Sequence, residues 1–327
     1  MSKILMLAPF FFGYELKIKD ELEEKGYFVK LYNDYSSYKP KLSLKEKIFC
    51  KIFRQKKKIL EVKKNEYFQK ILENEDIKKY DIIFIIKGES IPHWFYQELK
   101  NKTINSQWIS YQWDDIKNCI GVLERKKYFN KNFSYSELDA ENYGYIYRPF
   151  FYIYDFKYSK KGDVFFIGTE HSDREKVLIK ILKEINKLPN LKISCNLLIK
   201  KWKYIKKIKW LKRNKMYIVK EMKYEKVIKI MSEYKVAIEI PHDRQMTTTT
   251  RSIEAMGTRT KIITTVKDVE KKDFYNKKNY LIVDRNEPII DKKWLEEPYE
   301  ELEEKIRDRY TLSKWIEEIF DKNEEME

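Results

Sequence analysis

Short apolar runs alternate with longer amphipathic stretches along this chain, and the alternation predicts its fold. In the first half the runs are Lys3–Ala8, Tyr27–Tyr32, Asp81–Ile86, Gln107–Tyr111, Asn132–Tyr135 and Tyr145–Arg148. In the second half they are Asp163–Ile167, Leu191–Asn196, Met216–Val219, Val236–Ile240, Lys261–Thr265 and Tyr280–Val283. Strands that alternate with helix-length stretches are typical of parallel, doubly wound sheets. The pattern therefore predicts an α/β fold.

The two sets of runs are separated by residues 149–161, an aromatic and basic segment without clear periodicity. We interpret it as the connection between two Rossmann-like domains of six strands each, over residues 1–150 and 160–310. A C-terminal helix and an acidic tail follow at residues 311–327. Leu312, Trp315, Ile316 and Ile319 form an apolar stripe on that helix, so it can pack on either domain.

Composition supports a folded protein with a substantial core. The chain has 327 residues, of which 43% are hydrophobic, and its 68 Lys+Arg against 52 Asp+Glu give a net charge of +16. Its 3 cysteines are far apart, which argues against a zinc pair or a disulfide framework and favours a reducing compartment. No run approaches the roughly 18 apolar residues that span a bilayer. We therefore expect a cytoplasmic protein.

The positive charge is concentrated in two stretches with apolar residues at helical spacing. Residues 45–64 carry nine bases and two acids, and we expect a solvated face there. Ile199–Lys215 carries nine bases and no acid. Trp202 and Trp210 in this stretch leave two interpretations open, a solvated face or peripheral docking on an anionic membrane.

Basic charge with interleaved aromatic residues is also typical of nucleic-acid-binding proteins. This is the alternative function that composition raises. However, the chain has no RRM, KH or zinc-finger signature, and the α/β pattern extends over its whole length. We therefore do not expect a nucleic-acid partner.

One segment of the second half has the residues of an anion site. After the run that ends at Pro241, the threonines of 247–250 open a helix, and their hydroxyls lie beside unpaired backbone N–H groups. Arg251 adds a cation suited to phosphate, and Glu254 shares its helix face. Gly257 closes the helix, where a left-handed residue is expected. The alternative is a well-capped helix with an internal ion pair.

A second segment, Asp163–Glu175, repeats this strand, turn and helix order. Gly168 allows close approach of a ligand, and we expect Ser172 to cap the helix. His171 and Arg174 are placed to reach a diphosphate.

Together these motifs resemble the donor-binding half of bacterial GT-B-fold glycosyltransferases of the CgeB-like type, which make capsule, exopolysaccharide or lipopolysaccharide. The resemblance is carried by Gly168 with Arg174, then by Gln245, Thr247–Thr249, Arg251, Glu254 and the KIITT that follows. It spans most of residues 160–320, with weaker similarity in ILMLAP, IIFIIKGE and SYQWDD. Many relatives carry glycine or leucine at the positions of 248–250, so the phosphate contacts are expected to differ in detail.

The resemblance implies two Rossmann-like domains facing a cleft, with the C-terminal helix crossing back to the N-terminal domain. It implies a nucleotide-sugar donor, with the diphosphate at the helix N-terminus and the ribose on Glu254. The expected donor-binding residues are Gly168, Thr169, His171, Arg174, His242, Gln245, Thr247, Thr248, Thr249, Thr250, Arg251 and Glu254. No cofactor and no metal are expected, since the chain lacks Asp-x-Asp and histidines at metal-binding spacing.

The acceptor is expected to be a saccharide or a lipid-linked sugar bound by the N-terminal domain. Residues at strand ends supply its candidate contacts, namely Gly13, Tyr14, Lys87 and Gly88. Inversion at the sugar requires a base for the acceptor hydroxyl, and the candidates are Glu89, Asp114 and Asp115. Each has a plainer alternative as an acid in the first turn of a helix, especially Asp115.

Overall fold

The computed structural model describes residues 1–38, 40–53, 55–198, 217–218, 222–243 and 247–321. The basic stretch Ile199–Lys215 and Gln245 lie outside them. The chain divides into two compact units, one formed by Met1–Pro149 with Ile316–Glu327 and the other by Phe150–Trp315.

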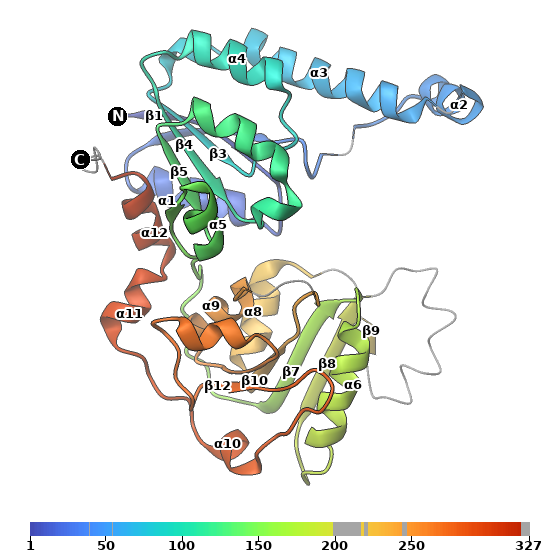
Figure 1. Cartoon of the computed structure of the whole chain (residues 1–327), viewed down its shortest axis with the longest axis vertical. Helices are drawn as coiled ribbons and strands as arrows, with labels where there is room; N and C mark the ends of the chain where they lie inside the picture. The colour runs from blue at the N-terminus through green and yellow to red at the C-terminus, as the bar shows by residue number, and fades with distance from the viewer. Residues whose placement is uncertain (39, 54, 199–216, 219–221, 244–246, 322–327) are drawn as a thin grey trace. The chain divides into compact units, whose positions relative to one another are not determined.

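The first unit is built on a parallel sheet in the order β2-β1-β3-β4-β5-β6 (Figure 1). Its strands are β1 (Lys3–Ala8), β2 (Phe28–Asn33), β3 (Ile82–Ile86), β4 (Gln107–Gln112), β5 (Lys131–Ser134) and β6 (Ile146–Tyr147). Its helices are α1 (Tyr14–Glu24), α2 (Leu44–Phe53), α3 (Lys56–Asn74), α4 (His93–Lys102), α5 (Glu137–Tyr143), and the short 3-10 helices η1 (Ile77–Lys79), η2 (Ile116–Asn118) and η3 (Ile120–Tyr128).

Apolar side chains are buried on both faces of this sheet, as a parallel sheet requires. All five residues of β3, IIFII, are buried. On one face, Ile83 and Ile85 pack with Phe68 of α3 and Phe95 of α4. On the other face, Phe84 contacts Phe320, with ring centroids 5.1 Å apart. The sequence run is continuous rather than alternating because both faces are covered.

The second unit has a parallel sheet in the order β12-β11-β10-β7-β8-β9. Its strands are β7 (Gly162–Thr169), β8 (Ile193–Leu198), β9 (Tyr217–Ile218), β10 (Tyr234–Glu239), β11 (Lys261–Thr264) and β12 (Tyr280–Ile282). Its helices are α6 (Arg174–Ile185), α8 (Tyr224–Ser232), α9 (Thr250–Thr258), α10 (Lys292–Glu296), α11 (Glu304–Arg309) and the 3-10 helix η4 (Lys267–Lys271).

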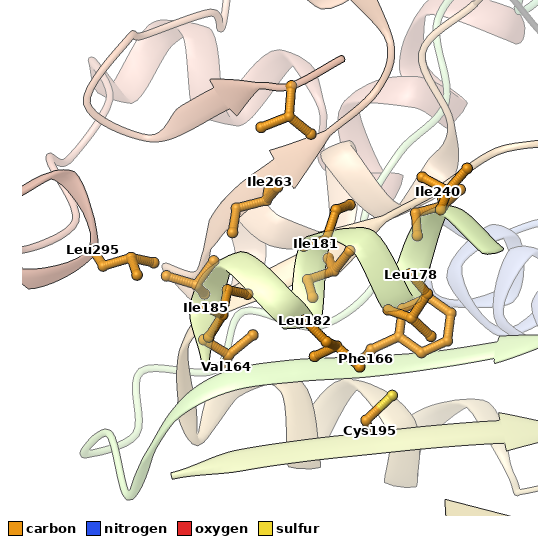
Figure 2. Close-up of a cluster of buried hydrophobic side chains, with 14 of the residues drawn as sticks. Val164, Phe166, Leu178, Ile181, Leu182, Ile185, Cys195, Ile240, Ile263 and Leu295 are labelled. Carbon is orange, nitrogen blue, oxygen red and sulfur yellow. The ribbon is translucent and has the colours of Figure 1, made fainter. Parts of the chain in front are cut away.

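Alternate residues of β7 face the two halves of the core of this unit. Figure 2 shows Phe166 among Leu178, Ile181 and Leu182 of α6. Phe165, on the opposite face, belongs to the cluster formed with α8 and α9. Helices therefore cover both faces of the sheet, and all twelve strands predicted from the sequence are present, with ends shifted by at most a few residues.

Residues 150–161, which the sequence suggested as a connection, are part of the second unit. The backbone N–H of Phe156 donates to the carbonyl of Gly257 at 2.8 Å. The ammonium of Lys160 donates to the carbonyls of Ser232 and Thr258, each at 3.0 Å. Burial lowers the pKa of Lys160 to about 8. This segment is fixed along α8 and α9.

The last helix, α12 (Leu312–Ile319), begins in the second unit, and the chain from Ile316 onward groups with the first unit. The return to the N-terminal half that we expected is therefore confirmed. Within the first unit, Lys25 pairs with Glu317 at 2.9 Å, and Arg148 with Glu318 at 2.7 Å. The predicted apolar stripe is buried.

Within the described part of the chain, no helix combines the length and the apolar character needed to cross a bilayer.

Candidate functional site

Strands β7 and β10 are neighbours in the second sheet, but the chain leaves them toward opposite edges. β7 leads to β8 on one side, and β10 leads to β11 on the other. Such a reversal separates the two loops at the carboxyl ends of the strands, and open α/β sheets bind ligands there. The described residues that are expected to bind the donor lie at the end of β7, in the loops that follow β7 and β10, and on the helices α6 and α9 that come after those loops.

His171 follows β7 and His242 follows β10, and the structure brings their imidazole rings together. The ring centroids are 5.4 Å apart and the planes differ by 20°, so the rings are stacked. Burial, together with the charges of Arg174 and His242, lowers the pKa of His171 to about 4. His171 is therefore neutral at pH 7 and accepts or donates hydrogen bonds without a charge.

Arg174 is the first residue of α6, and its guanidinium points back across the strand ends. Its Nε donates to the carbonyl of Ile240 at 2.6 Å, and its Nη1 donates to the carbonyl of Thr169 at 2.9 Å. A Cβ on Gly168 would lie 2.9 Å from the ring of Phe166 and 3.2 Å from Nη1 of Arg174. Gly168 thus makes room for the guanidinium.

The predicted helix cap at Ser172 is wrong. The N-cap residue of α6 is Asp173, and no side chain makes a capping hydrogen bond there. Ser172 has φ +44, a left-handed conformation. The carboxylate of Asp173 instead pairs with Arg285, with Nη2–Oδ1 at 2.5 Å. A second guanidinium is thereby fixed beside the ends of β10 and β11, because Arg285 also donates to the carbonyl of Pro241 at 3.4 Å and to the hydroxyl of Thr265 at 2.9 Å.

The N-terminus of α9 is capped by Thr249, whose hydroxyl accepts from the backbone N–H of Arg251 at 3.1 Å. The same hydroxyl donates to the carboxylate of Glu239. The N–H and the hydroxyl of Thr248 both donate to Asp268, each at 3.2 Å. Two of the four threonine hydroxyls therefore organise the turn. Thr247 and Thr250 are half-buried at its two ends.

Glu239, the last residue of β10, is a buried carboxylate that sequence reasoning missed. It accepts hydrogen bonds from three hydroxyls: from Thr249, from Ser252 at 3.0 Å and from Thr264 at 2.6 Å. Burial raises the pKa of Glu239, which the three hydroxyls and the charge of Arg251 counteract. It ties the start of α9 to two strands.

Arg251 and Glu254 lie one turn apart on α9 and form the ion pair that their spacing indicated, at 3.4 Å. Glu254 is 4% exposed and Arg251 is half-buried. The charges of Arg251 and Arg285 act on Arg174: burial, together with these two arginines, lowers the pKa of Arg174 to about 10. Three guanidinium groups therefore gather at one edge of the sheet, and sequence reasoning had missed Arg285.

The expectation that Gly257 closes α9 in a left-handed conformation is wrong. The helix extends to Thr258, and its left-handed cap is Arg259, with φ +46. A Cβ on Gly257 would collide with the backbone carbonyl of Tyr154 and lie 2.8 Å from the ring of Tyr152. Glycine is required here by the close approach of residues 150–161, which the local sequence does not reveal.

In the first unit, the expected acceptor-side residues also lie at strand ends. Gly13 is the N-cap of α1 in a left-handed conformation, with φ +84, and Tyr14 begins that helix. Lys87 and Gly88 follow β3 and are both left-handed, with φ +65 and +72. A Cβ on Gly88 would collide with the hydroxyl of Tyr96.

The three candidate bases have different surroundings. Asp114 pairs with Lys87 at 2.5 Å. Burial opposes the charge of Lys87, but the hydrogen bond to Asp114 and the charge of Asp34 raise its pKa. Asp115 is buried, accepts from the hydroxyl of Tyr135 and pairs with a lysine. Glu89 is exposed.

A further carboxylate, Asp34, was missed because it follows an unremarkable strand. It is fully buried after β2 and accepts from Ser36 and from the backbone N–H of Gly88. Burial raises its pKa. Asp34 therefore supports the turn that carries Lys87 and Glu89.

His93 begins α4 and lies between Arg125 and Tyr128 at 3.0 and 3.3 Å. Across the described ranges, no group of three or more His, Cys, Asp or Glu side chains is arranged to hold a metal ion.

No family model matches the chain, and no curated protein matches its sequence. Solved structures do match its fold. AviGT4, a glycosyltransferase involved in avilamycin A biosynthesis, aligns with a TM-score of 0.55 at 10% identity, over 97% of this chain and 96% of its own. Anabaena Alr3699/HepE, solved with UDP and glucose, aligns with a TM-score of 0.54 at 11% identity, over 98% and 96%.

A third match is S. aureus TarM, with a TM-score of 0.52 at 15% identity, over 76% of this chain and 56% of TarM. At these identities the likeness concerns the fold. The chain has the two-domain, Rossmann-like GT-B fold that the sequence predicted.

Proposed function

We propose that this protein is a glycosyltransferase. It transfers a sugar from a nucleotide-sugar to a saccharide or lipid-linked acceptor, in the cytoplasm at the inner face of a bacterial membrane, during synthesis of a surface polysaccharide such as capsule or lipopolysaccharide. The observation that carries the proposal is the gathering of Arg174, Arg251 and Arg285 with the N-terminus of α9 at the switch point of the second sheet. Two matched folds, HepE and TarM, were solved with UDP.

The chemistry of the leaving group fits this arrangement. When the glycosidic bond to the donor breaks, negative charge develops on the diphosphate. Guanidinium groups and a helix N-terminus stabilise such charge without a metal ion. The carboxylate of Glu254, held by Arg251, suits the hydroxyls of a ribose, as the family resemblance implies. Chelation by EDTA is therefore expected to leave turnover unchanged.

For the acceptor, we propose Glu89 as the base that removes the hydroxyl proton. Asp115 is buried and bound by Tyr135, and Asp114 is paired with Lys87. Glu89 is exposed next to the left-handed Gly88, so a substrate hydroxyl can reach it. Glu89→Gln is expected to lower kcat about 100-fold, which is within the range for loss of a general base.

The test is a thermal-shift screen against UDP, GDP, CMP and dTDP sugars, followed by a transfer assay with the donor that binds. A ligand that binds only the folded protein raises its stability by roughly 2.7 kcal/mol at 100 times its Kd. Stabilisation by one nucleotide class supports the proposal. No stabilisation by any of them, together with a steeply salt-dependent affinity for RNA or DNA, would favour the nucleic-acid alternative.

A further inference from the structure

Helix α2 is held by polar contacts. At its N-terminus, the backbone N–H of Ser43 donates to Glu46 at 2.7 Å, and the N–H of Glu46 donates to the hydroxyl of Ser43 at 3.2 Å. This is a capping box. Glu46 also pairs with Lys63 of α3 at 2.8 Å, and the hydrogen bond from Lys63 lowers the pKa of Glu46 to about 2. The helix is thus defined and attached through charged groups.

Three apolar side chains in the described part of α2 are exposed. Leu44 is 74% exposed, Ile52 is 65% exposed and Phe49 is 43% exposed. Leu44 and Ile52 are eight residues apart, so they lie on the same side of the helix, about two turns from each other. Val62, in the first half of α3, is 50% exposed. A solvated helix would turn such residues inward, so our expectation of a merely solvated face does not explain this arrangement.

Exposed lysines lie close to these apolar residues along the chain. Lys45 and Lys51 are on α2, and residues 56–58, three consecutive lysines, begin α3. Residues 45–64 carry a net charge of +7 in the sequence. An apolar surface bordered by lysines is the composition of helices that lie in the interface of an anionic bilayer.

The C-terminal half of α3 is anchored by Phe68 and Ile71, which are buried in the core of the first unit. The ring of Phe68 lies 4.8 Å from that of Phe95 on α4. Figure 1 shows α2 at the end of α3 that lies away from the strands of the sheet. The exposed apolar and basic groups are therefore presented at the tip of a fixed helix.

We propose that α2 and the first turns of α3 dock on an anionic lipid bilayer, with Leu44 and Ile52 inserted among the acyl chains and the flanking lysines at the headgroups. A soluble polyanion such as a nucleic acid would use the lysines but would leave the apolar side chains in water. A protein partner with an acidic rim would require a preformed groove of matching length. Leu44 and Ile52 would insert into the bilayer, and the lysines spread along α2 and the start of α3 would contact its headgroups. A fluid anionic surface fits this combination best.

The experiment is co-sedimentation of the full chain with vesicles of phosphatidylglycerol and phosphatidylcholine, and with vesicles of phosphatidylcholine alone. Two double variants separate the two contributions: Leu44→Ser with Ile52→Ser, and Lys57→Glu with Lys58→Glu. The matched controls are Ile104→Ser with Ile289→Ser, whose side chains are 77% and 80% exposed elsewhere, and Lys157→Glu with Lys187→Glu. Circular dichroism and nucleotide binding report folding independently.

We expect the wild type to sediment with the anionic vesicles and not with the neutral ones. Each α2–α3 variant is expected to lower the partition coefficient at least about tenfold, and the loss caused by the lysine variant should shrink in high salt. The controls should bind like the wild type. Equal binding of the Leu44/Ile52 variant, or absence of vesicle binding by the wild type, would overturn the proposal. So would binding to heparin that matches binding to vesicles in every variant. Nucleotide binding that persists in all variants separates these outcomes from failure of the proposed sugar transfer.

Discussion

Arg251 and Glu254 are joined on one face of α9, with guanidinium and carboxylate 3.4 Å apart and Glu254 almost completely buried. The buried carboxylate depends on this cation, since an uncompensated buried charge is costly. The side chain of Arg251 is 23% exposed, and its Nη1 also lies 3.3 Å from Sδ of Met231. One residue thus serves both the fold of the site and its charge.

Replacing either partner is expected to disable donor binding. Arg251→Ala removes a cation from the developing diphosphate charge, so kcat/KM for sugar transfer should fall about 100- to 1000-fold. For Glu254→Ala, kcat/KM should fall by at least about tenfold, because the contacts of the carboxylate with the donor hydroxyls are lost. Steady-state kinetics with the identified donor measures both.

The matched control is Arg309→Ala, which breaks a surface ion pair with Asp273 in the same unit. It should leave kcat/KM within about twofold of the wild type, because exposed ion pairs contribute little. Wild-type turnover in Arg251→Ala and Glu254→Ala would contradict the assignment of the donor site to α9.

Replacing Glu239 is expected to give a different phenotype, because its buried carboxylate orients the start of α9 and is not proposed to contact the ligand. Glu239→Leu leaves the hydroxyls of Thr249, Ser252 and Thr264 without their acceptor. Each unsatisfied buried hydroxyl costs about 1–3 kcal/mol, so the unfolding midpoint in urea should fall clearly. Nucleotide Kd should rise as the α9 turn loosens, and Glu239→Gln should recover part of both losses. An unchanged Kd in a destabilised Glu239→Leu protein would show that Glu239 serves the fold alone.

The strands were predictable because each is a local property of the sequence. A run such as IIFII must be buried on both faces, and all five of its residues are buried in β3. The Arg251–Glu254 pair was predictable for the same reason, because one helical turn fixes its geometry. Ser172 failed as a cap because the loop before α6 is shaped by the long-range pairing of Asp173 with Arg285.

The missed residues depend on which strands become neighbours. Glu239 is the fourth residue of VAIE and looks like an ordinary end of a strand. Its partners come from α9 and from β11, twenty-five residues later at Thr264. Arg285 follows β12, and it reaches the site because only β11 separates β12 from β10 in the sheet. The exposure of Leu44 and Ile52 on α2 was not predictable for a related reason, since the spacing of apolar residues does not show what covers them.

Gly168 gives a prediction about space. In Gly168→Ala the new methyl group would meet the ring of Phe166 at 2.9 Å and the guanidinium of Arg174 at 3.2 Å. Arg174 is therefore expected to shift, which should weaken nucleotide binding about tenfold, and overpacking should cost about 1–3 kcal/mol. Gly121→Ala is the control, since a Cβ there meets nothing within 4 Å. Isothermal titration with the nucleotide and urea unfolding measure both effects, and equal affinities in the two variants would contradict the role given to Gly168.

The stacked pair of His171 and His242 leads to a pH prediction. Burial, with Arg174 and His242, lowers the pKa of His171 to about 4 in the folded protein, from 6.5 for an ordinary histidine. Between these values the unfolded chain binds a proton that the folded protein does not. Stability should therefore be complete above pH 6.5 and fall as the pH drops toward 4. Because His171 is only half-buried, solvent screening reduces the effect, and we expect a loss on the order of 1 kcal/mol. His171→Asn should lack this decline.

Binding of the nucleotide should raise the pKa of His171, which is opposite to the effect of burial. A diphosphate within a few ångströms stabilises the imidazolium, so the pKa of His171 should rise by about one unit or more when the nucleotide binds. His242→Asn should raise it only in part in the free protein, because burial is the largest cause of the shift. NMR titration of the imidazole resonances, with and without the nucleotide, measures both. A His171 pKa near 6.5 in the free protein would contradict the effect of burial, and a pKa that the nucleotide leaves unchanged would place the diphosphate away from the loop that follows β7.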